Sequence, residues 1–412
     1  MKSDLDALMQ EADLDALLIA GPAQHNASVA YFTGLVHVSD GYVIKKRGEE
    51  PILFHFPMER EEAKRTGLRT KNLSEYDDQA FIKQAHGDHN KARALRFQQM
   101  FAEFGVTGRI GLYGKGEIGT HYGTLRATEE LLPDLTFVAE SLENSTLRKA
   151  RATKDEQELA RIRKMGEITT AVVGDVAGFL TSHQVRNGVL ITRAGEPLTI
   201  GEVKRRINLW LAMRGAENPE ATVFAMGRDG GFPHSVGQED QALETGVPIV
   251  FDIFPCEEGG GYFYDFTRTW CLGYAPDDVQ ALYNDVLDVY QKVSAAIEPN
   301  RPCRDFQVLT CELFREKGHD TIMDNWQIES GYVHSLGHGL GLDIHESPRF
   351  RDDDTNTDVL KPGSVFTIEP GLYYPERGMG VRLENSVFMR PDGSIEVIAD
   401  YPMDLVLEMP GS

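Results

Sequence analysis

Short apolar, β-prone runs alternate with polar helical stretches in the first third of the chain. The apolar runs occupy residues 16–20, 52–56, 110–113 and 135–138, and a polar helix is expected over 90–104. This alternation is typical of an α/β domain. No phosphate-binding Gly-Lys-Ser/Thr loop occurs in this region, and we expect a structural domain rather than a nucleotide site.

A domain boundary is predicted near residue 150. The segment 144–157 is dense in charge, and a long helical pattern follows it over 156–180. The pattern rests on apolar residues at helical spacing, namely Leu159, Ile162, Met165 and Ile168. We therefore divide the chain into domains 1–150 and 151–412.

The second domain is predicted to mix helices with antiparallel strands. A glycine-rich turn, 257–261, joins two β-prone runs into a hairpin. The last fifty residues alternate in polarity like a β-meander. The expected elements are a helix from about 199, a strand over 222–226, hairpin strands over 248–254 and 262–272, helices over 276–297 and 304–317, and the meander over 364–407.

Composition excludes several classes of protein. Hydrophobic residues make up 41% and charged residues 26% of the 412 residues, which indicates a globular chain rather than a disordered or fibrous one. The 64 acidic residues exceed the 42 basic ones by 22, and a field of that sign repels phosphate backbones and anionic membrane surfaces. We expect neither nucleic acid nor membrane as a partner.

The start of the chain and its cysteines favour a cytoplasmic protein. Residues 1–6 are polar and acidic, unlike a signal peptide, and every apolar run is shorter than the ~20 residues of a membrane-spanning helix. Four cysteines without a Cys-x-x-Cys pair predict reduced thiols. Cys256 and Cys271 are expected on opposite arms of the hairpin, as packing residues.

Four acidic residues lie in strand-like contexts where charge facing solvent is not expected. They are Asp252, Asp265, Glu369 and Glu384. A carboxylate in an apolar strand must be paired, protonated or bound to metal, because removing an isolated charge from water is costly. For any one of them alone, an outward-facing or arginine-paired acid is the simpler interpretation. Four together indicate a site.

Three histidines alternate with three glycines in a short segment. They are His334, His338 and His345, with Gly337, Gly339 and Gly341. On a helix, His334 and His338 would suggest a zinc-protease pair, but the glycines disfavour a helix and the associated glutamate pattern is absent. A buried structural histidine explains each one singly. Together they predict a loop or strand that lines an imidazole-rich pocket.

Charge balance points to two metal ions. Four carboxylates and one neutral imidazole offset the charge of two divalent cations, and an oxygen-rich site without thiolates suits Mn²⁺, with Co²⁺ or Zn²⁺ as alternatives. Two metals about 3.5 to 4 Å apart can share a water, lower its pKa and stabilise an oxyanion. Hydrolysis by a hydroxide that bridges two divalent metals is the predicted reaction class.

The order Asp, Asp, His, Glu, Glu, with its flanking residues, resembles the pita-bread metallopeptidases, the superfamily of methionine aminopeptidase, aminopeptidase P, prolidase and creatinase. The resemblance covers about residues 155–412, and the first 150 residues resemble the N-terminal domain of aminopeptidase P and prolidase. It implies an α/β N-terminal domain plus an α+β pita-bread catalytic domain. The motifs are Asp252, Asp265-Phe-Thr-Arg-Thr, Gly337-His338-Gly-x-Gly-x-x-x-His345-Glu, Thr367-Ile-Glu369-Pro-Gly and Arg382-Leu-Glu384.

The resemblance implies a role for each predicted metal ligand. Asp252 would ligate one metal, and Asp265 and Glu384 would bridge both. His338 and Glu369 would ligate the second metal. Glu369 would also move the proton of the bridging water.

Other residues matched by the resemblance would contact the substrate or a ligand. His234 would face the leaving group, and His345 would donate a hydrogen bond to the substrate carbonyl or the oxyanion. Thr267 would hold the ligand Asp265 from its outer side. For His334, a wall of the substrate pocket and a packing role are both open.

The activity that the resemblance implies is hydrolysis of Xaa-Pro bonds in short proline-containing peptides, by a homodimer whose N-terminal domain helps to close the pocket. Dipeptides (prolidase) are favoured over longer peptides (aminopeptidase P), because Arg349 follows His345-Glu-Ser-Pro and could clamp a free carboxylate. A surface arginine beside the acidic run 352–354 is the alternative for Arg349, and ordering of the site is the alternative for Arg382. A metal-retaining lyase and an inactive binding module are the rivals from other classes.

The chain departs from the family pattern at four places, which bear on substrate preference more than on metal binding. Ile253-Phe254-Pro255 replaces the usual small residue after the first metal aspartate, and the two aspartates stand 13 residues apart. Residues 181–197 resemble an insertion, and Asn385 stands where an acid often follows the last ligand.

Overall fold

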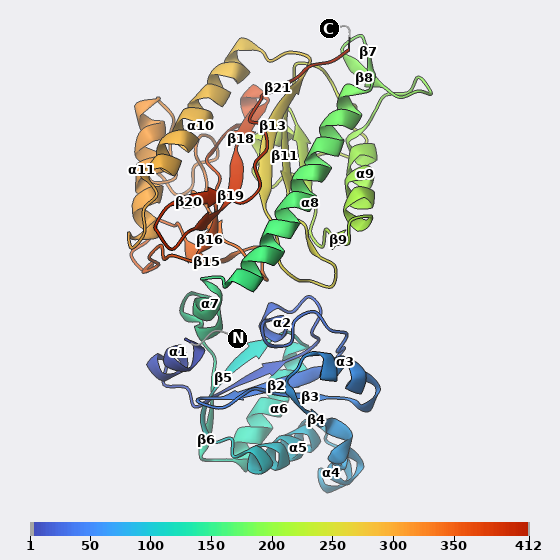
Figure 1. Cartoon of the computed structure of the whole chain (residues 1–412), viewed down its shortest axis with the longest axis vertical. Helices are drawn as coiled ribbons and strands as arrows, with labels where there is room; N and C mark the ends of the chain where they lie inside the picture. Colours follow the sequence, from blue (N-terminus) through green and yellow to red (C-terminus); the bar gives the residue numbers. More distant parts are fainter. Residues whose placement is uncertain (1–3, 411–412) are drawn as a thin grey trace. The chain divides into compact units, whose positions relative to one another are not determined.

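A computed structural model describes residues 4–410 of the chain, which fold into two compact units (Figure 1). Unit 1 is the chain up to Arg151 together with Gly259–Gly261. Unit 2 is Ala152–Glu258 together with the chain from Tyr262 onward. We describe each unit by itself.

Unit 1 is built on a six-stranded mixed sheet with the strand order β4-β3-β2-β1-β5-β6. The central strand β1 runs antiparallel to β2 and parallel to β5. The strands are β1 (Ala16–Ala20), β2 (Gly41–Lys46), β3 (Ile52–His55), β4 (Arg69–Asn72), β5 (Gly108–Gly114) and β6 (Leu135–Val138). The helices are α1 (Leu5–Glu11), α2 (Ala27–Thr33), α3 (Arg60–Arg65), α4 (Asp78–Gln84), α5 (His89–Phe104), α6 (Ile118–Leu131) and α7 (Thr146–Arg151).

Alternate residues of β1 enter two different cores, because successive side chains of a strand point to opposite faces. Leu17 and Ile19 join one core with residues of α1, α2 and α7. Ala16 and Leu18 join the other core with Phe97 and neighbouring residues of α5. Unit 1 therefore has helices on both faces of its sheet, and the predicted α/β class is confirmed.

The four strands and the helix predicted in unit 1 are present, whereas β2 and β4 escaped prediction. Strand β4 reads Arg-Thr-Lys-Asn, so it has no apolar pattern, and it lies at the edge of the sheet. The spacing Gly114-x-Gly116-x-x-Gly119 after β5 matches a dinucleotide-binding loop. However, the Glu117 carboxylate caps the N-terminus of α6 by accepting a hydrogen bond from the Gly119 N–H, where a phosphate would bind.

Unit 2 contains a large, mostly antiparallel sheet whose main path is β10-β11-β13-β19-β16-β14-β15. Strand β20 pairs with β19, and β21 pairs with β13. The strands are β10 (Val223–Met226), β11 (Pro248–Ile253), β13 (Phe266–Leu272), β14 (His338–Gly339), β15 (Glu346–Arg349), β16 (Val365–Ile368), β19 (Glu384–Met389), β20 (Ile395–Val397) and β21 (Val406–Leu407).

Two pairs of helices accompany this sheet (Figure 1): α8 lies beside α9, and α10 lies beside α11. The side chains of α10 and α11 share one hydrophobic core with β16 and β19, through residues such as Val286, Phe306 and Phe366. Helix α8 begins with a capping box formed by Asp155 and Glu158. The helices are α8 (Glu156–Thr181), α9 (Ile200–Ala212), α10 (Asp277–Ala296) and α11 (Cys303–Glu316).

Three small two-stranded sheets complete unit 2. The predicted insertion forms the hairpin of β7 (Gln184–Arg186) and β8 (Val189–Ile191). The predicted meander is interrupted, because β17 (Gly371–Tyr374) and β18 (Met379–Arg382) pair with each other in a small separate sheet and not with the large one. The third sheet pairs β9 (Ala216–Glu217) with β12 (Cys256–Glu257).

The predicted hairpin exists, but its details differ from the expectation. Strands β11 and β13 pair antiparallel, yet β13 begins only at Phe266 because β12 turns aside to pair with β9. Cys256, on the first arm, forms an antiparallel bridge with Phe263 of the second arm, and Cys271 on the second arm lies opposite Pro248, so the two thiols sit on opposite arms, as expected, but do not face each other. All four cysteines are free and buried. Among residues 4–410, no helix combines the length and apolarity needed to cross a bilayer.

Candidate metal centre

Three neighbouring strands bring one row of polar side chains together. Asp252 on β11 lies opposite Thr267 on β13, and Thr267 lies opposite Glu384 on β19. Residues directly opposite one another on paired strands project to the same face. Asp265 lies two residues before Thr267, so the alternation of a strand directs it to that face as well. Three of the predicted carboxylates therefore meet on one side of the sheet.

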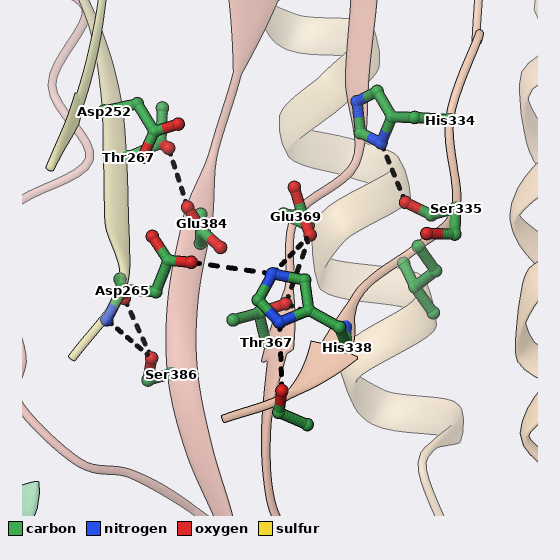
Figure 2. A network of polar contacts seen from close by, with 12 residues as sticks. Asp252, Asp265, Thr267, His334, Ser335, His338, Thr367, Glu369, Glu384 and Ser386 are labelled. Carbon is green, nitrogen blue, oxygen red and sulfur yellow. Dashed lines mark hydrogen bonds and ion pairs between the residues drawn. The ribbon is translucent and has the colours of Figure 1, made fainter. Parts of the chain in front are cut away.

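The remaining two predicted ligands come from β14 and the end of β16. The His338 Nε2 atom lies 3.5 Å from an Asp265 carboxylate oxygen and 3.4 Å from a Glu369 oxygen (Figure 2). Thr367 organises both residues: its hydroxyl oxygen accepts a hydrogen bond from the His338 backbone N–H, and its hydroxyl donates to Glu369. A side chain at Gly337 would approach the Thr367 carbonyl oxygen to 2.1 Å, so only glycine permits this packing.

The donor atoms fit a divalent cation. Asp265, His338 and Glu384 each offer a ligand atom within 4.8 Å of the others. One oxygen each of Asp252, Asp265 and Glu384 is buried without a hydrogen-bond partner among residues 4–410. Buried carboxylate oxygens without partners are costly, and a bound cation would satisfy them. Carboxylates with one imidazole are a suitable ligand set for Mn²⁺ and related ions.

Electrostatics within the group supports the same conclusion. Burial, followed by the charge of neighbouring carboxylates, raises the pKa of Asp265 and of Glu384 well above the ordinary range. Burial also raises the pKa of Glu369, although Arg382 opposes the shift. Burial, with a contribution from His345, lowers the pKa of His338 to about 3, so its imidazole is neutral. A neutral imidazole is the form that binds metal.

The Arg382 guanidinium makes hydrogen bonds to members of this row of side chains. It donates to Asp252 at 2.6 Å, to the Thr267 hydroxyl at 3.2 Å and to the Tyr373 hydroxyl at 2.6 Å, and it approaches the Pro233 carbonyl oxygen at 3.4 Å. Thr267 in turn donates to Glu384 at 2.7 Å, rather than to Asp265 as the resemblance implied. These contacts favour the ordering role for Arg382 over direct substrate binding.

The three predicted substrate-facing histidines have different surroundings. The His345 ring lies 4.4 Å from the His338 ring, centroid to centroid, and is exposed. His334 is bound at Nε2 by the Tyr373 hydroxyl at 2.9 Å, and burial lowers its pKa to about 3. His234 is exposed on the loop that follows the 3-10 turn Asp229–Gly231, next to Pro233, which contacts Arg382.

Arg349 lies opposite the ligand His338 where β15 pairs with β14. Its backbone N–H and its Nε both donate to one oxygen of Asp358, at 2.8 and 3.2 Å. The acidic run beside it, 352–354, pairs with Arg304 through Asp352 and Asp354. The carboxylate that holds Arg349 is that of Asp358, which follows the run.

Several residues of the site were missed from the sequence. Thr367 precedes Glu369 by two positions, as Asp265 precedes Thr267, and that spacing on a strand could have indicated its role. Tyr373 joins His334 to Arg382, and Asp358 holds Arg349, but neither carries a local signal. Lys154 forms an ion pair with Glu346, which lies 192 positions farther along the chain.

Comparison with known proteins gives matches over both units. Residues 160–391 match the model of metallopeptidase family M24, and residues 2–149 match the creatinase/prolidase N-terminal domain. The Xaa-Pro dipeptidase of Pyrococcus furiosus is 27% identical over 402 residues, covering 96% of this chain and 97% of the relative.

Solved structures of other proteins are similar in fold to this chain over nearly its whole length. The Xaa-Pro dipeptidase from Bacillus anthracis has a TM-score of 0.73 at 25% identity, covering 98% of this chain and 97% of that structure. The X-Pro aminopeptidase from Thermotoga maritima has a TM-score of 0.73 at 23% identity, covering 97% and 99%, and shares the fold. The chain therefore belongs to metallopeptidase family M24, and its pita-bread catalytic domain follows a creatinase/prolidase N-terminal domain in the sequence.

Proposed function

We propose that this chain hydrolyses Xaa-Pro peptide bonds with two divalent cations, Mn²⁺ foremost, and favours dipeptides. The observation that carries the proposal is the buried group of carboxylates with unpaired oxygens around the neutral imidazole of His338. The names of the relatives supply the substrate class. Proline creates a special demand, because the tertiary amide of an Xaa-Pro bond has no N–H for a general protease to hold.

The five ligands have distinct positions for this task. Asp252, Asp265, His338, Glu369 and Glu384 would hold the cations. When bound, the cations would polarise the scissile carbonyl and acidify a water. Glu369, whose carboxylate lies 3.4 Å from the His338 Nε2 atom, would accept a proton from that water.

Two solvent-exposed histidines, His345 and His234, would contact the reacting bond. His345 lies beside the ligand His338 and is exposed, so it can donate a hydrogen bond to the carbonyl oxygen as negative charge develops there. His234 lies on an exposed loop and would face the leaving proline nitrogen. His334 is occupied by Tyr373 and would serve as a pocket wall.

The preference for dipeptides rests on Arg349. Asp358 fixes its backbone and its Nε atom. Neither terminal guanidinium nitrogen of Arg349 makes a hydrogen bond to another of residues 4–410. Those two nitrogens can form the paired bonds that a free carboxylate accepts. A dipeptide places its proline carboxylate close to the reacting bond, so Arg349 would recognise it there.

The test compares Ala-Pro, C-terminally amidated Ala-Pro and an Ala-Pro-Xaa tripeptide, each with and without Mn²⁺. We expect Mn²⁺-dependent hydrolysis that is fastest with Ala-Pro. Arg349→Ala should raise KM for Ala-Pro by roughly 10-fold or more and leave the amidated substrate nearly unchanged, because only the free carboxylate loses its partner. Steady-state kinetics measures both constants.

Arg351→Ala is the matched control, because Arg351 is an exposed arginine two residues farther along the chain. It should leave KM for both substrates unchanged. Equal effects of Arg349→Ala on the free and amidated dipeptides, with faster cleavage of the tripeptide, would establish the aminopeptidase P alternative. An absence of Xaa-Pro hydrolysis under every metal condition would refute the proposed function.

A further inference from the structure

A buried ion pair joins Lys154 to Glu346, the residue that follows His345. The Lys154 ammonium is 2.9 Å from a Glu346 carboxylate oxygen, and the two side chains are only 1% and 0% exposed. The partners are separated by 192 positions in the sequence, so the pair joins two distant segments of unit 2. Burying two charges requires close pairing and further hydrogen bonds. None of the roles proposed above for the metal ligands involves this pair, so those roles do not explain it.

Glu346 is the immediate neighbour of His345. It is buried at the start of β15, whereas His345 is exposed and faces His338. His345 is the last residue of the bend 341–345 and Glu346 is the first residue of β15, so the buried carboxylate fixes the backbone directly next to the imidazole. The carboxylate that Lys154 holds therefore constrains the position of the His345 imidazole.

The pair also fixes the turn that leads to His345. The second oxygen of Glu346 accepts the Asp343 backbone N–H at 3.1 Å. A side chain at Gly341 would approach the bound Glu346 oxygen to 2.6 Å and the Lys154 Cε atom to 2.9 Å. The turn thus packs its backbone directly onto the ion pair, and only glycine leaves the space.

Lys154 is itself anchored at a rigid point. Its backbone N–H donates to the Gly363 carbonyl at 2.7 Å, and it immediately precedes Asp155, the residue that caps α8. Helix α8 is seven turns long at the usual pitch and is buried along one face. A lysine fixed at such a helix start can hold a loop in one position.

We propose that Lys154 is a positioning residue for His345, acting through Glu346. This inference rests on the proposed function, in which His345 contacts the substrate carbonyl. Lys154 acts through Glu346, whose carboxylate oxygen lies 2.9 Å from its ammonium. Its removal frees Glu346 and lets the 341–346 segment shift, so that the His345 imidazole no longer reaches the carbonyl oxygen in the transition state.

A double-mutant cycle tests this mechanism. Lys154→Met should lower kcat by roughly 10- to 100-fold, the range of groups that orient a site from its outer side, with KM changed by less than about threefold. In a His345→Ala background, adding Lys154→Met should change kcat by less than about threefold, because the residue through which Lys154 acts is gone. An equal loss in both backgrounds would overturn the proposal.

Removal of one partner of a buried pair can prevent folding. If Lys154→Met does not fold, the cycle uses Lys154→Met combined with Glu346→Gln, which removes both charges and keeps an oxygen for the Asp343 N–H. Arg163→Met is the control, because Arg163, on the helix α8 that Lys154 precedes, makes a bidentate ion pair with Glu396, at 3.0 and 2.9 Å. It should leave kcat unchanged; a loss equal to that of Lys154→Met would refute a specific role.

A second measurement does not depend on activity. In histidine-labelled protein, Lys154→Met should shift the NMR signals of the His345 ring and leave those of His319, which is held by Tyr374 and Asp285, in place. Bound metal per chain should stay at the wild-type value. Unchanged His345 signals would overturn the inference even if the chain cleaves Xaa-Pro bonds. Shifted signals in a chain without Xaa-Pro hydrolysis would refute the proposed function alone.

Discussion

Buried charged side chains in unit 1 have different neighbours from the buried acids of the metal centre in unit 2. In unit 1, the buried Lys45 ammonium lies 2.6 Å from Asp6, and the buried Arg96 guanidinium lies 3.0 Å from Asp78. Each of these charges faces an opposite one. In unit 2, several acids are buried against one another, and their repulsion raises the pKa of Asp265 and Glu384 beyond the effect of burial.

Unit 1 contains a useful counterpart to that group, the buried acid Glu59. One of its oxygens accepts hydrogen bonds from the Ser39 backbone N–H and hydroxyl, and the other has no partner among residues 4–410. A folded chain can bear the cost of a single buried carboxylate oxygen without a hydrogen bond. A cluster with three unpaired oxygens needs a cation. The crowding of acids therefore identifies the site better than the burial of any one acid.

The sharpest way to break this comparison is to replace one acid in each unit by its amide. Glu384→Gln should lower kcat by more than about 10³-fold, because a ligand in the centre of the group contributes more than the 10- to 100-fold of outer residues. Glu59→Gln should leave kcat within about twofold, since it keeps the oxygen that Ser39 contacts. Steady-state hydrolysis of Ala-Pro measures both. Similar losses in the two variants would mean that buried acids of either unit serve structure alone.

A smaller effect is expected from the residue that orients Glu384. Thr267→Val keeps the shape of the side chain but removes the hydroxyl that donates to Glu384 and accepts from Arg382. We expect metal affinity to fall by roughly 10- to 100-fold. Thr170→Val is the control, since its hydroxyl only bonds back to its own helix, at Gly166. A Thr267→Val chain with wild-type affinity for Mn²⁺ would remove Thr267 from the account.

The mildest test varies pH. Burial raises the pKa of Glu369 to about 8, so the metal-free site retains a proton there near neutrality, whereas His338, with a pKa of about 3, has none to release. Burial shifts the pKa of Asp265 and Glu384 in the same direction as that of Glu369. Metal binding must displace those carboxyl protons, so affinity for Mn²⁺ should rise with pH, by about tenfold per unit for each proton released. Equilibrium dialysis between pH 6 and 8 measures this; an affinity independent of pH would contradict the shifts.

The same shifts determine how stability responds to pH. Above about pH 7 the carboxyls of the unfolded chain are ionised, whereas Glu369 of the folded, metal-free site has a pKa of about 8 and still holds a proton. The folded, metal-free site then binds more protons than the unfolded chain, so its stability should fall as pH rises further. Bound metal should abolish that fall.

Much of the fold and the members of the buried acidic group could be predicted from the sequence, for identifiable reasons. Strand β1 is a short continuous apolar run, and helix α8 carries apolar residues at helical spacing, so the local pattern sufficed. Strand β4 carries none, because its pairing with β3 and not its side chains makes it a strand. The ligands could be found because each sits in a short motif.

The supporting residues could not be found in this way. Lys154 and Glu346 meet only after the chain has folded, and neither lies in a motif that names the other. Tyr373 and Asp358 are similar: each acts through a partner brought close by the pairing of strands or the path of a loop. Sequence motifs therefore predicted which side chains meet in the buried acidic group, whereas the structure was needed to see what holds those side chains in place.

The central claim is that the acidic cluster of unit 2 is a binuclear metal centre. Its most direct test is the number of Mn²⁺ ions bound per chain, measured by equilibrium dialysis with elemental analysis for the wild type, Glu384→Gln and Glu59→Gln. The account predicts two ions for the wild type and for Glu59→Gln, and loss of tight binding for Glu384→Gln, because Glu384 would bridge both ions. An active wild-type chain without metal, or two tightly held ions in Glu384→Gln, would contradict it.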